Sequence, residues 1–493
     1  MLTRAYTKGA AAWQWVIFSV LQSFNLYQIV THAMWRDELQ VWSIVRESRT
    51  ITELFSNMRY DGFPALWYVF LWGLSFISSS PLVMQLFHFV CSFAAQLLVM
   101  TRSPFSGRMK LAILAGYYIS FEYCVISRAY VLGVLFLFMF CAFYEWLSEH
   151  PAVKGGILGL LANTSIYGAM VSLVFAGDAV YDALNKKRSA AGGGHKIAGF
   201  AAVYGALLIT SAVVILPPDD GTYAAGLVLN TDISFKFYLF CRNLISLIPI
   251  PVMKTAFWNS LLFIDAGFWP TVATSMFVLL AVWFALRSSP RHLGIFAAGF
   301  ICIWVFSVIK YEGALRHVGA LLLLFIACIW LAAESVRIKG MPVSRYSQIA
   351  VGFIVTANII AFATASYYHL IYDFSGSREM TDIIRKFDSA VPVVADADYA
   401  ASSVAGYLGR PLYYARNHKA QTFIRWNRER MSVSQTDITD MARDLASGSG
   451  GGRALILLNY PMEPEQAGFL ARTRDSIVDD EVFYLYEYDA YKK

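Results

Sequence analysis

The stretch THAMWRDELQVWSIVRESRT (residues 31–50) follows a long apolar run that contains no charged side chain. Arg36, Asp37 and Glu38 occur together just after that run ends. An apolar run of about 20 residues is long enough to cross a membrane as a helix. The stretch therefore predicts a membrane protein with a group of charges where its first span meets water.

The composition of the whole chain indicates a membrane protein with many spans. Of its 493 residues, 57% are hydrophobic and 15% are charged, whereas about 25% of the residues of a soluble protein are charged. The net charge is +6. Lys and Arg fall mainly between apolar runs, which is the pattern of membrane topology and does not indicate nucleic-acid binding.

Eleven apolar runs predict membrane spans, and the first is interpreted as an uncleaved helix because it is longer than the apolar part of a signal peptide. The runs are 13–33, 81–100, 111–127, 129–147, 152–166, 168–184, 196–216, 270–287, 292–309, 317–335 and 346–367. Several are shorter than the ~20 residues that a straight span needs. Basic loops lie in the cytoplasm, and here they are 101–110, 185–196, 287–292 and 336–345. This pattern predicts a cytoplasmic N-terminus and an external C-terminal part.

The charge-free region 64–101 is too long for one span and barely long enough for two. The basic loops place residues 34–63 outside only if this region crosses once. We therefore expect a re-entrant or interfacial helix at 64–79 and a span at 81–100. A twelve-span arrangement, in which 64–79 also crosses, is the alternative.

Two external regions lie between the spans. In residues 34–63, apolar side chains recur twice at helical spacing, and Thr50 with Glu53 fits a helix-capping box. We expect two amphipathic helices on the membrane surface there. Residues 217–269 contain the Pro-broken stretch NLISLIPIPVM, which does not resemble a regular span. We expect an external lid loop in that region.

From about residue 372 the composition changes to that of a small soluble α/β domain. SREMTDIIRKFDSA predicts a helix, VPVVADADYA a strand and then a helix, and RPLYY and RALILLNY two further strands. EVFYLYEYD is expected to form an edge strand. The Gly-rich segment 446–454 lacks the ending of a phosphate-binding loop and is interpreted as a turn. The chain thus divides into a membrane domain, 1–371, and a soluble domain, 372–493.

Polar side chains that could carry chemistry gather in four groups, all on the external side of the eleven-span arrangement. The groups are Asp37 with Glu38, then Asp61, then Arg128, and then Lys310 with Arg316 and His317. Each group alone has an ordinary explanation, such as a helix cap, a turn, a polar loop or an arginine that reaches the interface. Neighbouring residues on a helix point about 100° apart. Asp37 and Glu38 therefore cannot both face one small site.

The convergence of these groups on one side suits transfer from a lipid-linked phosphate. A carboxylate can take a proton from an acceptor hydroxyl, and Arg, Lys or a divalent cation can stabilise charge on a departing phosphate. Two other classes stay open. A transporter or flippase of a lipid-linked glycan would carry ionisable residues near the middle of its spans, where this chain has few. A non-catalytic scaffold would not need the clustered charges.

In the order and spacing of several short motifs, the chain resembles the GT-C class of integral-membrane glycosyltransferases. It is especially similar to the bacterial relatives of protein O-mannosyltransferases and of the lipid A aminoarabinose transferase. The motifs are WRDELQVW, LFSNMRYDGFPALWYVFLW, SRAYVLGVLFLF, LLANTSIYGA and VIKYEGALRHVGALLLLFIACIW. The expected fold is a polytopic α-helical membrane protein of about 11 transmembrane helices, GT-C-like, with external amphipathic helices and a small C-terminal α/β soluble domain.

The resemblance implies an inverting enzyme of the bacterial inner membrane that uses a polyprenyl-phosphate sugar donor on the periplasmic side. It implies that Asp37 is the general base, accompanied by Glu38, and that Asp61 binds a metal or positions the acceptor. Arg128 would lie near the donor phosphate. Arg316 and His317 match a basic pair that follows the lid loop. Lys310 lies in the same short loop and is expected to join them, because several cationic donors there suit a phosphate.

The chain departs from the pattern of these relatives at one place. They commonly have E-G-H-P where this chain has DGFP, and Phe63 can neither bind a metal nor form a hydrogen bond. A divalent cofactor, Mg²⁺ or Mn²⁺, is therefore left open, with Asp61 as its candidate ligand. The motifs identify neither the sugar nor the acceptor, which could be a glycan, a lipid or a protein.

Overall fold

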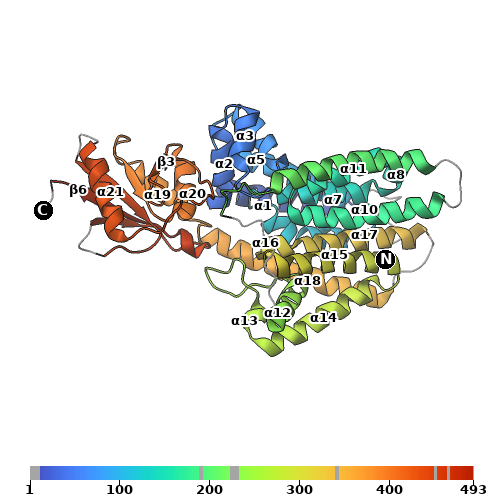
Figure 1. Cartoon of the computed structure of the whole chain (residues 1–493). Helices are drawn as coiled ribbons and strands as arrows, with labels where there is room; N and C mark the ends of the chain where they lie inside the picture. The colour runs from blue at the N-terminus through green and yellow to red at the C-terminus, as the bar shows by residue number, and fades with distance from the viewer. Residues whose placement is uncertain are drawn as a thin grey trace.

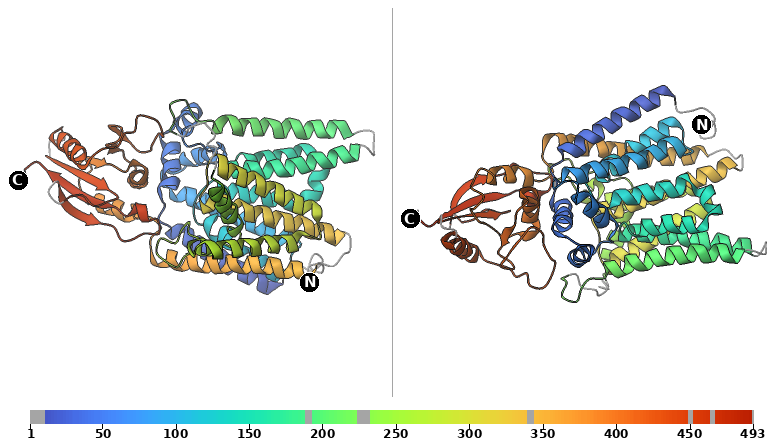
Figure 2. Two further views of the ribbon diagram at one scale, coloured as in Figure 1. Left: turned by 60° about the horizontal axis from the view of Figure 1, so that its bottom comes forward. Right: turned by 90° about the horizontal axis from the view of Figure 1, so that it is seen from above.

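The computed structural model describes residues 11–187, 193–222, 232–338, 344–448, 452–463 and 467–491. A bundle of long helices forms one end of the molecule and a sheet domain forms the other, with α2 and α3 between them (Figure 1). Figure 2 shows the same division from two further sides.

The bundle is built from apolar helices. The longer ones are α1 (Ala12–Thr31), α5 (Leu82–Arg102), α10 (Ile166–Lys187), α11 (Gly193–Ile215), α14 (Phe268–Leu286), α15 (Pro290–Ile309), α17 (Ala320–Ile338) and α18 (Arg345–Ile371). The shorter ones are α6 (Gly107–Leu114), η1 (Tyr118–Glu122), α7 (Tyr130–Ala142), α8 (Tyr144–Glu149), α9 (Pro151–Ala162), α12 (Ile233–Ile245), α13 (Leu262–Asp265) and α16 (Leu315–Val318). Among the described residues, seven helices are long and apolar enough to cross a membrane. The chain is thus a multi-pass membrane protein, and the number of eleven spans stays a prediction.

The predicted run 111–127 is not one regular helix. α6 ends at Leu114, and the π-helical turn η1 follows it. Short π-helical turns occur frequently at functional sites, and this one precedes the segment that carries Arg128.

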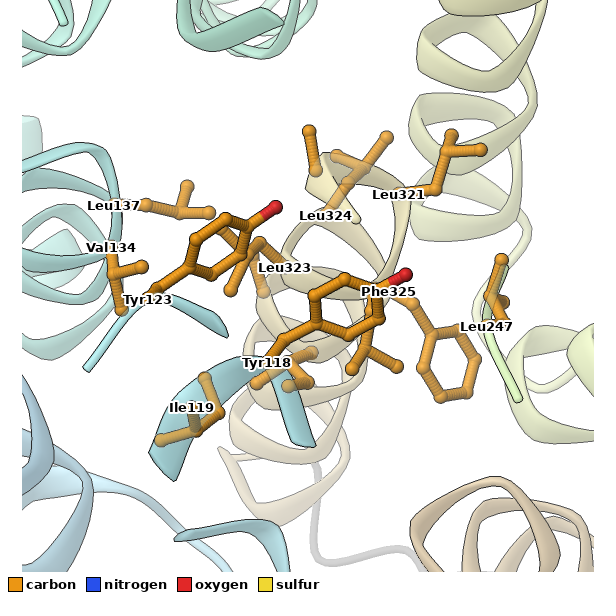
Figure 3. Packing of buried hydrophobic residues seen from close by; sticks show 14 of the residues in the cluster. Tyr118, Ile119, Tyr123, Val134, Leu137, Leu247, Leu321, Leu323, Leu324 and Phe325 are labelled. Carbon is orange, nitrogen blue, oxygen red and sulfur yellow. The ribbon is translucent and has the colours of Figure 1, made fainter. Parts of the chain in front are cut away.

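α17 lies at the centre of the bundle, and its side chains pack on all sides. The span that begins at Leu315 and includes most of α17 has 83% of its apolar window buried. A helix that is apolar on every face is typically enclosed by other elements. Figure 3 shows the packing around it, with the labelled residues Tyr118, Ile119, Tyr123, Val134, Leu137, Leu247, Leu321, Leu323, Leu324 and Phe325.

The amides that interrupt the apolar sequence of α1 face the bundle. Gln22 Nε2 donates a hydrogen bond to Gln96 Oε1 at 2.7 Å, and Asn25 Nδ2 donates one to Ser120 Oγ at 3.2 Å. Such polar contacts join helices where no water is present. The residues that break the apolar run therefore hold α1 against α5 and η1.

The two predicted amphipathic helices are α2 (Arg36–Glu47) and α3 (Ile51–Met58). The capping box predicted for α3 is formed, because Glu53 N donates to Thr50 Oγ1 at 3.2 Å and Thr50 N donates to Glu53 Oε2 at 3.3 Å. The sequence thus fixes where this helix begins.

The next helix is α4 (Leu66–Ser75), and residues just before and after it contact α2. Before it, Gln40 Nε2 donates to Asp61 Oδ1 at 3.3 Å, and after it, Trp42 Nε1 donates to the carbonyl oxygen of Ser79 at 3.3 Å. Ten residues of helix extend about 15 Å, half the thickness of the hydrocarbon core. This is shorter than a straight span needs, so α4 agrees with the eleven-span arrangement, and whether it crosses stays a prediction.

The described helix ends that flank the basic loops, among them the ends of α10, α14 and α17 and the start of α18, lie away from the sheet domain (Figure 2). Arg291 forms ion pairs with Asp178 at 2.6 Å and Asp182 at 2.5 Å, and the Arg287 guanidinium lies 5.6 Å from the Tyr346 ring centroid. These contacts join the loop 287–292 to α10 and to the start of α18. Residues 188–192 and 339–343 of the other basic loops lie outside the described residues.

The C-terminal domain is a sheet of six strands in the order β3-β2-β1-β4-β6-β5. The strands are β1 (Val393–Ala395), β2 (Leu412–Tyr414), β3 (Lys419–Gln421), β4 (Arg453–Leu458), β5 (Gly468–Arg472) and β6 (Tyr484–Asp489). β1 is parallel to both β2 and β4, and the other pairs are antiparallel. The helices are α19 (Ser377–Ile384), α20 (Asp398–Leu408), α21 (Gln435–Gly448) and η2 (Asp479–Glu481).

The prediction that EVFYLYEYD forms an edge strand is wrong. β6, which contains most of it, pairs with β4 on one side and β5 on the other. The sequence analysis did not predict β5, the strand on the outer side of β6. Its sequence, GFLAR, has a glycine and an arginine at its ends and only a short apolar centre. Of the Gly-rich segment 446–454, residues 449–451 lie outside the described residues.

The sheet domain packs directly against α2. α20 approaches α2 closely at Gly406, where a Cβ atom would lie 2.7 Å from the Cβ of Leu39. Arg36 Nη1 forms an ion pair with Asp480 at 2.7 Å, and Ser377 Oγ donates to the carbonyl oxygen of Met34 at 2.7 Å. The C-terminal domain therefore packs against the helix that carries Asp37 and holds it in place.

Candidate active site

Asp37 and Glu38 lie in the first turn of α2 and point in different directions. Glu38 is fully buried, whereas 29% of the Asp37 side chain is exposed. α2 begins after Trp35, whose backbone N–H donates to Glu38 Oε2 at 3.2 Å and is thereby satisfied. Glu38 thus caps the helix locally and leaves Asp37 facing the site.

The Asp37 carboxylate lies between two arginines that come from distant parts of the chain. Its Oδ2 is 3.5 Å from Arg128 Nη1 and 3.4 Å from Arg316 Nη2. Burial alone would raise the pKa of Asp37, but Arg128, Arg316 and Arg36 outweigh it and hold the pKa below its ordinary value. Asp37 is therefore ionised in this state.

Aromatic rings hold both guanidinium groups in place. The Arg128 guanidinium lies 4.8 Å from the Phe63 ring centroid, and that of Arg316 lies 5.0 Å from Trp35 and 5.2 Å from Trp258. Cations on aromatic faces are stabilised by about 0.5–2 kcal/mol. Phe63, which departs from the relatives' pattern, thus supports an arginine in this chain.

Trp258 comes from the predicted lid loop, residues 217–269, of which 223–231 lie outside the described residues. Its Nε1 donates to Glu122 Oε2 at 3.0 Å, and Tyr117 donates to the same oxygen at 2.6 Å. The sequence analysis missed Trp258 and Glu122. In the sequence, Glu122 is a carboxylate inside an apolar run. A charged side chain in such a run usually has a specific partner, so this position could have been noticed. Opening and closing of the loop stays a prediction.

Arg242 on α12 was also missed, and it fixes the segment before α16. Its Nη1 donates to the carbonyl oxygen of Glu312 at 2.9 Å and its Nη2 to that of Gly313 at 2.6 Å. Arg316 follows three residues later. Arg242 therefore positions Arg316 through the backbone.

Asp61 lies at the same site but in a different environment. Tyr68 donates its hydroxyl hydrogen to Asp61 Oδ2 at 2.7 Å, and Gln40 donates to Oδ1 at 3.3 Å. Burial raises the pKa of Asp61 to about 6, although these hydrogen bonds and Arg128 oppose the shift. Asp61 therefore titrates near neutral pH, unlike Asp37.

This pKa predicts how the Asp61→Asn variant behaves. The folded protein holds a proton on Asp61 up to about pH 6, whereas the unfolded chain releases it near pH 4. The contribution of Asp61 to stability is therefore full below about pH 4 and is lost as the pH rises to about 6. Asn resembles the protonated acid, so the thermal midpoint of the wild type should fall relative to that of Asp61→Asn across this range. An unchanging difference would contradict the prediction, and Asp382→Asn, at an exposed carboxylate, is the control.

Glu38 lies behind Asp37 and connects three segments. His32 Nε2 lies 2.8 Å from Glu38 Oε2, and the backbone N–H of Ser127 donates to Glu38 Oε1 at 2.6 Å. His32 Nδ1 in turn lies 3.1 Å from His369 Nε2. Glu38, expected to accompany the base, thus ties the end of α1 to α2 and to the residue before Arg128.

The phosphate-binding role of Lys310 and His317 stays a prediction, because the three cations that lower the pKa of Asp37 are all arginines. Lys310 is exposed at the C-terminal end of α15, and the cations whose charges act on Asp37 are Arg128, Arg316 and Arg36. His317 is buried, accepts a hydrogen bond from Ala314 N at Nδ1 (2.7 Å), and stacks on Tyr167 with ring centroids 5.3 Å apart. The structure therefore brings together Asp37, Asp61, Arg128 and Arg316.

Asp61, the candidate ligand of a divalent cation, is engaged in hydrogen bonds, and a metal at this site stays a prediction. Within the described ranges, no three His, Cys, Asp or Glu side chains lie close enough to hold one. Both oxygens of Asp61 accept hydrogen bonds from Gln40 and Tyr68, and the Phe63 ring lies against Arg128.

The helix order, the charged site beside the sheet domain and the α/β domain after the last span define a GT-C-like membrane fold. Two crystal structures of ArnT from Cupriavidus metallidurans share it. The apo structure aligns with a TM-score of 0.54 and the structure bound to undecaprenyl phosphate with 0.51, each at 12% identity over 97% of this chain and 98% of the other. No family model and no curated protein sequence matches the chain. The resemblance to the GT-C class is thus confirmed for the fold.

Proposed function

We propose that the protein is a glycosyltransferase that moves a sugar from a polyprenyl-phosphate donor to an acceptor hydroxyl, with inversion and with Asp37 as general base. The observation that carries the proposal is the partly exposed Asp37 carboxylate between two guanidinium groups at 3.5 Å and 3.4 Å. A carboxylate that takes a proton and cations that bind a phosphate are the groups such a transfer needs. The lipid phosphate bound to ArnT, which shares the fold, supports this choice of donor.

The donor must bind before Asp37 can act as a strong base. Without donor, Arg128 and Arg316 hold the pKa of Asp37 low, and a carboxylate of low pKa is a weak base. A donor phosphate is an anion that competes for the same two guanidinium groups. Its binding neutralises part of the positive charge beside Asp37 and adds a negative neighbour, and both changes raise the pKa of Asp37. The site thus couples activation of the base to occupancy by the donor.

The chemical step is a single in-line displacement. The acceptor hydroxyl gives its proton to Asp37 while its oxygen forms a bond to the anomeric carbon. The bond from that carbon to the phosphate oxygen breaks, and its electron pair leaves with the polyprenyl phosphate. Arg128 and Arg316 stabilise the charge that develops on the phosphate. Because the leaving group is already a stable anion, no strong general acid is required.

We assign the site to the periplasmic face of a bacterial inner membrane. The basic loops at the opposite end favour a cytoplasmic location for that end, which gives a cytoplasmic N-terminus and a periplasmic soluble domain. In this assignment residues 1–371 form the catalytic membrane domain. Residues 372–493 lie over the site, where an acceptor glycan, lipid or protein would approach.

The test of the function is a search for the product by mass spectrometry. The purified protein is incubated with defined polyprenyl-phosphate sugars and with a membrane extract as the source of acceptors. A sugar-sized mass increase on an acceptor, together with release of polyprenyl phosphate, is the expected result. Movement of the donor across proteoliposome membranes without any such product would instead indicate the flippase alternative.

Replacing either arginine should weaken use of the donor. Arg128→Gln and Arg316→Gln each remove a charged donor of hydrogen bonds, worth about 1.5–3 kcal/mol, so kcat/KM should fall about 10- to 100-fold. The measurement is a donor titration of the transfer rate, and Arg385→Gln, on the exposed surface of the sheet domain, is the matched control. An unchanged kcat/KM in both site variants would remove the arginines from the mechanism.

A further inference from the structure

The sheet of the C-terminal domain changes its winding direction beside β1. From β1 the chain passes through α20 to β2, and it later passes through α21 to β4, on the other side of β1. α20 packs with Val393 and Ala395 on one face of the sheet, and α21 packs with Val394 on the opposite face. Ligands of such sheets bind outside the carboxyl ends of the parallel strands, where the direction changes. This rule selects the residues that follow β1, β2 and β4.

Polar side chains from these three strand ends are hydrogen-bonded to one another. Asp396 directly follows β1, and Arg416 and Tyr460 come two residues after β2 and β4. Arg416 Nε donates to Asp396 Oδ1 at 2.8 Å, and the Tyr460 hydroxyl donates to Asp396 Oδ2 at 2.5 Å. Asp396 is 3% exposed, whereas Tyr460 is half-buried and 28% of the Arg416 side chain is exposed. The buried carboxylate therefore holds in place two side chains that a ligand could reach.

The strand ends offer both donors and acceptors of hydrogen bonds. Within the described ranges, Nε is the one guanidinium nitrogen of Arg416 that is hydrogen-bonded, so its other N–H groups can donate to a ligand. Asn459, the first residue after β4, donates through Nδ2 to the carbonyl oxygen of Asp480 at 2.9 Å, and its Oδ1 can accept. A hydroxyl group both donates and accepts, whereas a carboxylate only accepts and an ammonium group only donates. The mixed set therefore matches a ligand with several hydroxyl groups.

Two tyrosine rings border the same polar groups. The hydroxyl of Tyr399, in the first turn of α20, lies 3.4 Å from Asn459 Nδ2, and Tyr460 is the next residue after Asn459. Tyrosine presents an apolar ring and a polar tip, and a sugar ring has C–H faces and a rim of hydroxyl groups. An extended peptide would pair along the free edge of a strand, whereas these groups lie at strand ends. The arrangement thus favours a glycan over a peptide.

The strand ends lie beside the start of α2, which carries the proposed base. The Arg36 guanidinium lies 5.1 Å from the Tyr399 ring centroid, and its Nη1 lies 2.7 Å from Asp480 Oδ2. Asn459 binds the backbone of the same Asp480, and Asp37 directly follows Arg36. A chain of sugars bound at the strand ends could therefore present its terminal hydroxyl group to Asp37.

Resting on the proposed function, we propose that the acceptor is a glycan and that the carboxyl ends of β1, β2 and β4 bind it. The strand-end group, defined as Asp396, Arg416, Asn459 and Tyr460, holds the hydroxyl groups of one sugar unit. A neighbouring unit reaches Asp37 with the hydroxyl group that is glycosylated. The soluble domain thus selects the acceptor, while the arginines of the membrane domain bind the donor.

Binding of short oligosaccharides to the purified full-length protein tests this proposal. The probes are a panel of oligosaccharides of hexoses and N-acetylhexosamines, together with the bare polyprenyl phosphate. At least one oligosaccharide should bind. Arg416→Gln should weaken its binding at least tenfold, and Tyr460→Phe, which removes only a hydroxyl group, about fivefold. Binding of the bare polyprenyl phosphate should stay unchanged in both variants.

Arg443→Gln is the matched control. Arg443 also contacts an aspartate and a tyrosine, Asp440 at 2.6 Å and the Tyr488 hydroxyl at 3.2 Å. Tyr488 pairs with Ala454 near the start of β4, at the opposite end of the strands. This variant should bind both kinds of probe as the wild type does.

The outcomes separate this proposal from the proposed function. If no oligosaccharide binds, or if Arg416→Gln binds the oligosaccharide as tightly as the wild type, the glycan site is overturned. Equal weakening of the polyprenyl phosphate would give Arg416 a purely structural role and would also overturn it. If the oligosaccharide binds as expected but is never glycosylated, the proposed function fails and the glycan site stands. Transfer to a protein acceptor at an unchanged rate in Arg416→Gln would keep the function and remove the glycan site.

Discussion

Replacing Asp37 with Asn should lower the kcat of sugar transfer by about 10²- to 10⁴-fold, which is the usual contribution of a positioned general base. Asn keeps the shape of the side chain but cannot take the proton of an acceptor hydroxyl. Arg128 and Arg316 still lie on their aromatic neighbours, so the site should keep its structure. The measurement is the initial rate of product formation at saturating donor in detergent.

The same variant should bind the donor at least as tightly as the wild type. Asp37 competes with the donor phosphate for Arg128 and Arg316, and Asn removes the competing charge. Asp382→Asn, at an exposed carboxylate of the sheet domain, should change neither rate nor affinity. Normal turnover by Asp37→Asn would exclude Asp37 as the base, and weaker donor binding would contradict the competition.

Replacing Glu38 with Ala should destabilise the protein by about 3–5 kcal/mol, because removing one partner of a buried polar network leaves the others unpaired. Glu38 is fully buried, and its loss leaves His32 and the backbone N–H groups of Trp35 and Ser127 without this acceptor. The measurement is thermal unfolding of the purified protein in detergent. A much lower midpoint and a lower yield of folded protein are expected.

Glu47→Ala is the matched control, because Glu47 ends the same helix but its side chain is 45% exposed. The ion pair that it forms with Arg46 at 4.0 Å should contribute less than about 1 kcal/mol. If both variants unfold at the wild-type temperature, Glu38 does not hold these three segments together. A transfer rate lost without any loss of stability would instead give Glu38 a direct part in catalysis.

The membrane part could be predicted well because it depends on local composition. Apolar runs such as the one that became α5, and the capping box at Thr50 and Glu53, act within one helix and need no distant partner. The same holds for the different directions of Asp37 and Glu38, which follow from helical geometry. Predictions failed where a neighbour far along the chain decides the outcome. The sequence of β6 predicts an edge strand, and only its pairing with β5 makes it an internal strand of the sheet.

The side chains around Asp37 also divide into those that could be predicted from the sequence and those that could not. Asp61, Arg128 and Arg316 could be selected because charges are costly beside apolar runs and usually have partners. Trp258 and Arg242 could not, since an aromatic residue or an arginine near an interface is ordinary until its partner is known. Their roles come from contacts with Arg316 and with the segment before it.

The sequence by itself determined that this chain spans a membrane, that its candidate site residues gather on one side of it, and that a small α/β domain follows. These properties depend on hydrophobic length and charge placement, which each segment carries alone. Only the tertiary structure decided that Asp37 pairs with two arginines while Glu38 is buried in a separate network. The reason is that hydrogen bonds and ion pairs act over a few ångströms. They depend on which distant segments the packing brings within that range.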